Sequence, residues 1–176
     1  MNITRVVVGL LETNCYILSI DGHALVIDPG DQVDKIIKKI GNLTLDGIII
    51  THHHEDHDGG VDELIKKYKV PIYDRNNLSS GDNTVGKFKF KVIYNPGHTD
   101  DSISIYFKED NVMFVGDFIF RNSIGRCDLG GNMSDMLKSI DKIKKYRKDI
   151  ILYPGHGEET SLGYECMNNP YFVDYL

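Results

Sequence analysis

A dense run of histidines directly follows a short apolar segment of this chain. Residues 48–50 are all isoleucine, which predicts a strand buried on both faces, and residues 51–57 read Thr-His-His-His-Glu-Asp-His. The fold is therefore expected to present the histidines on a loop at the end of a buried strand.

Three further motifs place a polar group after a predicted strand: Pro96-Gly97-His98-Thr99, Val115-Gly116-Asp117 and Pro154-Gly155-His156-Gly157. Loops at strand ends are held by a rigid scaffold, so we expect all four loops to converge on one place. Neutral imidazole and carboxylate together suit zinc, iron and manganese, whereas calcium and magnesium sites are built from oxygen ligands. The pattern predicts a transition-metal site.

The spacing within the first motif favours two metal ions. His52 and His54 are two residues apart, so both side chains can point the same way in an extended or turning segment and bind one ion. Asp56 and His57 are adjacent and more naturally serve a neighbouring ion. A simpler interpretation stays open, in which this run is a solvated turn that opens a helix, because acidic residues are favoured at helix starts.

In the rest of the chain, strands are predicted mostly in runs, with helices at intervals. Strands are predicted at 3–8, 15–20, 24–27, 48–50, 71–73, 88–92, 102–107, 111–115 and 150–152, the first three as an antiparallel meander and those from 88 to 115 with one buried face. Helices are predicted at 32–40 with Gly41 as the stop, at 61–68, and after an N-cap at Ser134. Asp28 and Asp46 are interpreted as structural turn residues. This succession predicts two sheets packed face to face with helices outside.

Length and composition limit the class of protein. The 176 residues predict one domain over 1–176, and 20 Lys and Arg against 26 Asp and Glu argue against nucleic acid as a partner. The N-terminus lacks the features of a secretory signal, and no segment approaches the roughly 20 apolar residues that span a bilayer, so no membrane partner is expected. Three cysteines without a C-x-x-C pair suit a reducing, cytoplasmic location. The sequence does not predict the oligomeric state.

The order and separation of these motifs resemble the metallo-β-lactamase superfamily over nearly the whole chain. Pro-Gly-His-Thr, Gly-Asp and Pro-Gly-His-Gly are similar to the glyoxalase II branch. Residues 123–131 and the ending from Glu165 to Tyr171 are similar to the short bacterial members of that branch. The resemblance implies an α/β fold, the four-layer αβ/βα sandwich, which agrees with the layers expected above.

The resemblance also implies a role for each candidate residue. It assigns the first metal to His52, His54 and His98, the second to Asp56, His57 and His156, and a bridging position to Asp117, while His53 and Glu55 receive no role. Two divalent ions are implied, zinc first, with iron or manganese as alternatives. A hydroxide shared by the ions would attack an acyl carbon, and Asp56 would act catalytically by orienting it. Asp28 is expected to support the histidine loop.

Two departures from the glyoxalase II pattern bear on the substrate. Glyoxalase II proper continues into a helical domain that supplies much of its glutathione recognition, whereas 20 residues (157–176) follow His156 here. We therefore expect a small-molecule thioester substrate with weak discrimination in the thiol portion. Cys127 replaces the Thr of the family's Gly-Arg-Thr-Asp stretch. Arg121 and Arg126 are candidates for binding a substrate carboxylate, although a structural pair between Arg126 and Asp128 is favoured.

Three functions compete at this point. The leading hypothesis is a metal-dependent thioester hydrolase of the glyoxalase II-like kind. A persulfide dioxygenase is the second, because two histidines and one carboxylate from the same set form an open iron site for oxygen chemistry. The third is a metal-binding module without catalysis. β-Lactam hydrolysis is less favoured, because a cytoplasmic enzyme has no lactam target outside the cell.

Overall fold

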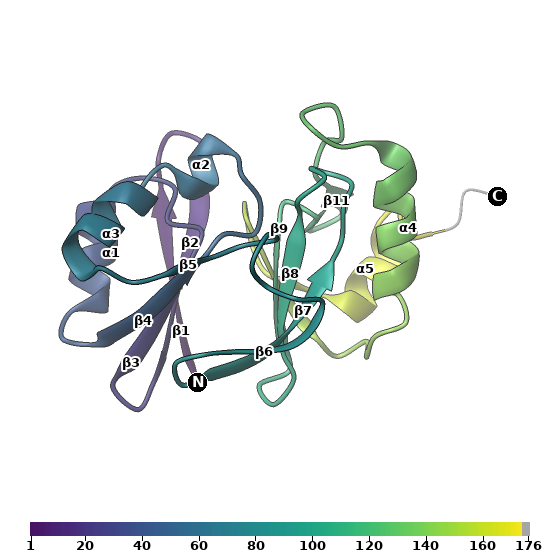
Figure 1. Cartoon of the computed structure of the whole chain (residues 1–176). Helices are drawn as coiled ribbons and strands as arrows, with labels where there is room; N and C mark the ends of the chain where they lie inside the picture. Colours follow the sequence, from purple (N-terminus) through teal and green to yellow (C-terminus); the bar gives the residue numbers. More distant parts are fainter. Residues whose placement is uncertain (174–176) are drawn as a thin grey trace.

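Two β-sheets lie face to face, with helices against the outer face of each (Figure 1). In the first sheet the strand order is β1 (Asn2–Val8), β2 (Thr13–Ile20), β3 (His23–Ile27), β4 (Thr44–Ile49) and β5 (Ile72–Tyr73). In the second it is β13 (Thr160–Ser161), β12 (Ile151–Pro154), β9 (Val112–Gly116), β8 (Ile103–Phe107), β7 (Phe88–Tyr94) and β6 (Gly81–Val85). The helices are α1 (Val33–Ile40), α2 (Glu55–Asp58), α3 (Val61–Tyr68), α4 (Met133–Ile143) and α5 (Leu162–Asn168), and β10 (Ile119–Phe120) pairs with β11 (Ser123–Ile124). This computed structural model describes residues 1–173, so the last three residues of the domain predicted over 1–176 lie outside the described part.

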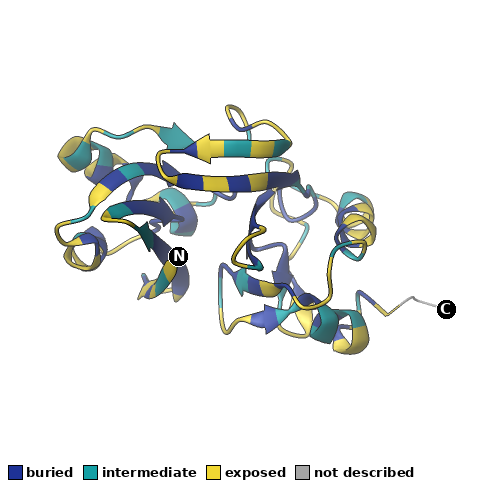
Figure 2. Ribbon diagram, turned by 90° about the horizontal axis from the view of Figure 1, so that it is seen from below, coloured by how far each residue is buried: buried dark blue, intermediate teal, exposed yellow. Residues whose placement is uncertain are grey.

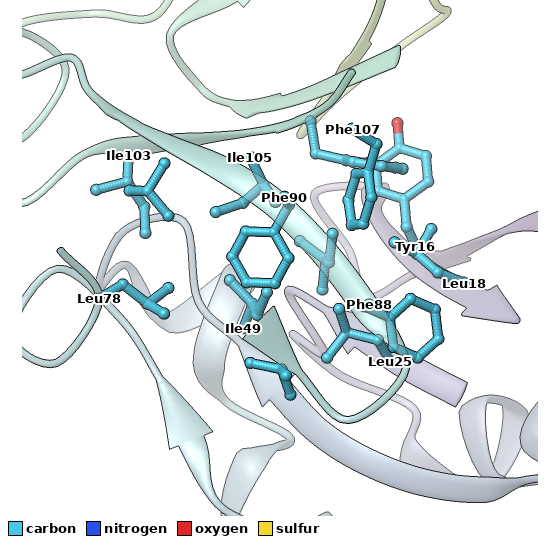
Figure 3. Packing of buried hydrophobic residues seen from close by; sticks show 14 of the residues in the cluster. Tyr16, Leu18, Leu25, Ile49, Leu78, Phe88, Phe90, Ile103, Ile105 and Phe107 are labelled. Atoms are coloured by element: carbon cyan, nitrogen blue, oxygen red, sulfur yellow. The ribbon is translucent and has the colours of Figure 1, made fainter. Parts of the chain in front are cut away.

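Successive side chains along a buried strand point to opposite faces of the sheet, so each sheet packs against a layer on both sides. Ile49 faces the second sheet, where it belongs to the same cluster as Phe88 and Phe114, while its neighbours Ile48 and Ile50 face α1 and α3. All three isoleucines are at most 1% exposed, which confirms the predicted burial on both faces. The strand predicted at 48–50 is longer than expected, since β4 begins at Thr44, and it ends at Ile49. Figure 3 shows side chains of both sheets meeting in the cluster between them.

A third apolar cluster covers the outer face of the second sheet. Met113 and Leu152 of that sheet pack with Met136 and Ile140 of α4 and with Leu162 of α5. Figure 2 shows exposed residues on the helices and in the loops, and exposed residues also alternate with buried or half-buried ones along β6 and β7. The predicted αβ/βα sandwich is confirmed by these three clusters between four layers. In the described part of the chain, no helix is long and apolar enough to span a membrane.

Strand direction decides where the polar loops gather. β7 and β9 are each antiparallel to β8, so they run the same way, and β12 is parallel to β9. In the first sheet β4 is parallel to β3. The carboxyl ends of β7, β9 and β12 therefore meet at one edge of their sheet, and Figure 1 places the start of α2, which follows β4, at the same end of the molecule.

The predicted elements are largely confirmed, with some corrections. The opening meander is antiparallel as predicted, and helix 32–40 is α1, stopped by Gly41. The predicted N-cap Ser134 lies inside α4, because Asn132 caps that helix by accepting a hydrogen bond from the Asp135 amide. β8 and β9 are buried on both faces rather than one, since helices cover their outer side. Asp46 lies within β4 rather than in a turn before it.

Candidate metal centre

Five imidazoles and two carboxylates meet where the loops converge. Two histidines follow β4, one each follow β7 and β12, and the carboxylate of Asp117 follows β9. Asp56 and His57 lie on the short helix α2. The side chains brought together are the seven named from the sequence: His52, His54, Asp56, His57, His98, Asp117 and His156. Convergence of the four loops is therefore confirmed.

The seven side chains form two groups with one carboxylate between them. His52, His54 and His98 can place ligand atoms within 4.8 Å of one another, and the same holds for Asp56, His57 and His156. Asp117 touches both groups. Its Oδ1 lies 3.3 Å from Nε2 of His57, and its Oδ2 lies 3.6 Å from Nε2 of His98 and 3.4 Å from Nε2 of His156.

Each imidazole uses its outer nitrogen to donate a hydrogen bond. His54 Nε2 donates to Leu129 O at 3.0 Å, His98 Nδ1 to Arg126 O at 2.6 Å, and His156 Nδ1 to Leu11 O at 2.9 Å. His57 Nδ1 donates to Asp28 at 2.9 Å, and His52 Nδ1 lies 3.1 Å from the Thr51 hydroxyl. With the outer nitrogen protonated, the inner nitrogen of a neutral ring carries a lone pair towards the centre. Metal-binding histidines show this arrangement.

Three buried polar atoms at the centre indicate that these residues fit a metal ion. Nε2 of His52, Nε2 of His57 and Oδ1 of Asp117 are buried and have no hydrogen-bond partner among the described residues. Leaving such groups unpaired costs about 1–3 kcal/mol each. A cation bound at the centre would satisfy all three, so the residues present fit a metal site.

The pKa values of these residues differ with their surroundings. Burial, and then the charge of His57, lowers the pKa of His52 to about 2, and burial also lowers that of His98. Burial alone would lower the pKa of His57, but the carboxylates of Asp117 and Asp28 outweigh it and raise the value to about 10. Burial would raise the pKa of Asp117, yet the imidazoles beside it hold the value far below its usual range. The carboxylates therefore favour a positive charge beside them, which a bound metal cation would supply.

The carboxylate of Asp28 accepts hydrogen bonds that hold neighbouring residues in place. Oδ1 accepts from the Thr51 amide at 2.8 Å, and Oδ2 accepts from the Thr51 hydroxyl at 2.6 Å as well as from His57. Asp28 also forms a possible ligand triple with His52 and His57. Because its oxygens already hold the strand end and one imidazole, we interpret it as a supporting residue, as expected from the sequence.

The N-terminal strands supply contacts that sequence reasoning missed. Thr13 Oγ1 donates to Asp56 Oδ2 at 2.8 Å, and this oxygen lies 3.2 Å from Nε2 of His156. The Asn14 amide group donates to the carbonyls of Pro154 and Gly157 at 3.0 and 2.9 Å, which fixes the loop of His156. Thr13 and Asn14 sit in an ordinary strand with no motif around them, so no local signal could have identified them.

A glycine allows the backbone to approach the centre closely. A Cβ at Gly155 would lie 2.2 Å from Asp117 Oδ1 and 2.6 Å from Cε1 of His57, closer than any side chain permits. The Pro-Gly-His-Gly motif therefore needs its first glycine for packing against Asp117 and His57.

Other polar residues singled out in the sequence lie outside the two groups. His53 bonds Asp58 at 2.9 Å and Asp74 at 3.0 Å on the surface. Arg126 forms the predicted bidentate pair with Asp128, with both bonds at 2.7 Å, and its carbonyl rather than its guanidinium faces the centre. Arg121 lies 3.6 Å from Glu158.

Cys127 is half-buried in the loop that carries two of the outer contacts. Its Sγ contacts the Gly125 carbonyl at 3.6 Å, while Arg126 and Leu129 on either side of it hold His98 and His54. Replacement of the family's Thr by Cys therefore leaves the backbone contacts of this loop to the histidines in place.

Comparison with known proteins agrees with this geometry. The chain is 33% identical to the probable metallo-hydrolase YqgX of Bacillus subtilis, with 95% of each chain covered. It is 30% identical to the hydroxyacylglutathione hydrolase GloC of Haemophilus influenzae, covering 97% of this chain and 98% of that protein.

Among solved structures, BLEG-1 B3 metallo-beta-lactamase matches with a TM-score of 0.94 and 30% identity, covering 98% of this chain and all of that one. TTHA1623 in a di-iron-bound form matches with a TM-score of 0.87 and 28% identity, over 96% and 99% of the chains. ETHE1 from Myxococcus xanthus matches with a TM-score of 0.90 and 27% identity, over 98% and 88%.

The model of the metallo-beta-lactamase superfamily matches residues 8–75 and 74–156. These two segments run from the end of β1 to His156 and include all seven residues of the cluster. The chain therefore belongs to the metallo-beta-lactamase superfamily.

Proposed function

We propose that this protein is a metal-dependent hydrolase of small acyl thioesters that holds two divalent ions. The proposed ligands are His52, His54 and His98 for the first ion, Asp56, His57 and His156 for the second, and Asp117 for both. One observation carries the proposal: every imidazole is anchored through its outer nitrogen and turns the inner one towards the same centre. The similarity to hydroxyacylglutathione hydrolases supports the thioester part.

Nitrogen and carboxylate donors suit zinc first, and iron and manganese are accepted by the same set. Two such ions, when bound, supply a water acidic enough to react near neutral pH and polarise the carbonyl of the substrate. No side chain is then required as a nucleophile.

The residues of the chain position the reacting groups. Asp56 presents Oδ2 to the centre, and Thr13 fixes this orientation by donating to the same oxygen. We propose that Asp56 accepts a hydrogen bond from the attacking water and so aims its lone pair at the acyl carbon. Thr13 is thus proposed as a positioning residue that acts through Asp56.

The test is a substrate panel on metal-loaded protein. It contains S-lactoylglutathione, the lactoyl thioester of N-acetylcysteamine, a penicillin and a cephalosporin, each measured before and after chelation and metal return. Thioester hydrolysis that disappears with the chelator and returns with the metal is expected. Hydrolysis of the lactams alone, or of nothing in the panel, would contradict the proposal.

A matched pair of histidines controls for folding. His54→Ala should lower kcat/KM by about 100-fold or more because it removes a ligand, whereas His53→Ala, one residue earlier and on the surface, should change it by less than about 3-fold. Equal effects of the two substitutions would argue against the ligand assignment.

The dioxygenase alternative predicts a different result in the same preparation. It requires iron at one site and consumption of oxygen with a persulfide substrate. We prefer the two-ion hydrolase because it gives a role to both groups of candidate ligands, whereas the dioxygenase needs one iron site. Oxygen uptake on a glutathione persulfide, without turnover of any thioester, would reverse the preference.

A further inference from the structure

A cavity of about 490 Å³ opens beside the second group of candidate ligands. Asp56 is the one candidate ligand among the residues that line it, so the cavity borders the second group through this residue. The other side chains that shape it are apolar or acidic: Val8, Leu10, Leu11, Asp31 and Glu55, and three glycines complete the lining. Among these described residues there is no lysine and no arginine.

The apolar wall comes from the turn between β1 and β2. The side chains of Leu10 and Leu11 are fully and two-thirds exposed, at 101% and 66%. The turn is nevertheless held in place, since the Leu11 carbonyl accepts from His156 Nδ1 at 2.9 Å and the Gly9 amide donates to Gln32 Oε1 at 3.3 Å. Exposed leucines on an anchored turn beside a proposed catalytic centre indicate a surface that binds an apolar group.

Two acidic side chains, Asp31 and Glu55, form another part of the wall. Asp31 and Glu55 belong to neither ligand group, so bound metal would not neutralise them directly. Asp31 accepts a hydrogen bond from the Gln32 amide at 2.6 Å, which is not a charged partner. Lys35 lines the adjoining cavity, where it bonds Gln32 at 2.8 Å. The cavity beside Asp56 therefore combines apolar contact area with local negative potential.

We propose that this cavity receives the thiol arm of the substrate and selects apolar, uncharged or cationic thiols over anionic ones. This rests on the proposed function, in which the acyl carbon lies at the ligands and the acyl group is small. The thiol arm is then the part long enough to extend from Asp56 to the leucines. An anionic arm would be repelled by Asp31 and Glu55, whereas a cationic arm would be attracted.

The experiment compares acetyl thioesters of three thiols that differ in charge: thiocholine (cationic), N-acetylcysteamine (neutral) and 2-mercaptoethanesulfonate (anionic). At low ionic strength kcat/KM is expected to be at least about 5-fold lower for the anionic ester than for either of the others. The difference should shrink in 0.5 M salt, where the screening length falls to about 4 Å. An anionic ester cleaved as fast as the other two would overturn the inference.

Charge reversal within the cavity tests which residues discriminate between cationic and anionic thioesters. The double variant Asp31→Lys with Glu55→Lys should reverse the order of the cationic and anionic esters. Asp34→Lys with Glu63→Lys is the matched control, because it changes the net charge equally but lines the adjoining cavity. A similar shift in both double variants would show a general charge effect and overturn the assignment to this cavity.

Binding of thioethers gives a readout that does not require turnover. S-ethyl ethers of thiocholine and of 2-mercaptoethanesulfonate cannot be hydrolysed, and saturation-transfer NMR measures their contact with the protein. The thiocholine ether should bind more tightly, and Leu11→Ala should weaken it. If no thioester is hydrolysed but this preference holds, the proposed function fails and the cavity assignment stands; if esters are hydrolysed without any preference, the reverse is true.

Discussion

Asp28 and His57 form a fully buried pair in which the carboxylate Oδ2 lies 2.9 Å from Nδ1 of the imidazole. The same oxygen accepts from the Thr51 hydroxyl, so one carboxylate joins the end of β4 to the second group of candidate ligands. The pair fixes the orientation of His57 before any ion is bound.

Asp28→Asn should weaken metal binding by about 10–100-fold while the fold persists. The amide cannot accept from both Thr51 and His57 as the carboxylate does, so the His57 ring loses its fixed orientation. Competition with a chromophoric chelator measures the affinity. Asp46→Asn is the matched control, since Asp46 pairs with His23 at 2.8 Å away from the centre. Unchanged affinity in Asp28→Asn would contradict the supporting role.

Fully loaded protein should contain two metal ions per chain. Seven converging donors exceed the three or four that one tetrahedral site uses. Plasma emission spectroscopy on protein prepared without chelator, and again after reconstitution, gives the count. Loading should also raise the melting temperature, because ions bind the folded state. A maximum of one ion after reconstitution would exclude the two-ion mechanism.

Asp117→Ala should lose more metal than His156→Ala. The Asp117 carboxylate approaches His57 at 3.3 Å and His98 at 3.6 Å, one imidazole from each group, whereas His156 belongs to one group alone. Removing a carboxylate between two cations also removes the charge that offsets their repulsion. Metal content per folded chain, with folding checked by circular dichroism, distinguishes the variants. Equal losses would argue against a bridging position.

Gly155→Ala should disrupt the centre without unfolding the protein. The added Cβ would overlap Asp117 Oδ1 and displace it from His57. Gly22→Ala serves as control, because Gly22 has a φ of +80° and no atom near the added Cβ, so only backbone strain of about 1–2 kcal/mol results. Metal content and urea unfolding are measured on both. Normal metal content in Gly155→Ala would show that the motif does not need this glycine.

Asn132→Ala should destabilise the metal-free protein by about 1 kcal/mol, because it removes the cap of α4. Ser134→Ala should change the free energy of unfolding by less than about 0.5 kcal/mol, since Ser134 is exposed within the helix. Urea denaturation compares the two. A larger effect at Ser134 would restore the cap that the sequence alone suggested.

The misplaced cap shows the limit of local patterns. Asn132 and Ser134 are both good N-cap residues, and the choice between them depends on where the helix starts. That start is set by the preceding loop, where the Asn132 amide donates to the Gly97 carbonyl at 3.0 Å, 35 residues earlier in the chain. The full burial of β8 has the same origin, because the helices that cover its outer face come from later sequence.

The candidate ligands could be named from the sequence because only a few residue types, histidine and aspartate among them, bind transition metals. The histidines and aspartates at strand ends could be picked out by residue type and spacing. All seven of these side chains converge, as expected. The residues that hold them do not identify themselves. Thr13 and the Leu11 carbonyl lie more than 40 residues from the side chains they orient.

The sequence by itself determined the strand and helix periods and identified the candidate metal ligands, since both depend on residue types and spacing along the chain. Only the tertiary structure decided which nitrogen of each imidazole faces the centre and which backbone carbonyls anchor the rings. It also decided that a turn carrying Leu10 and Leu11 stands beside Asp56. These depend on the packing of one sheet against the other, which joins segments far apart in sequence.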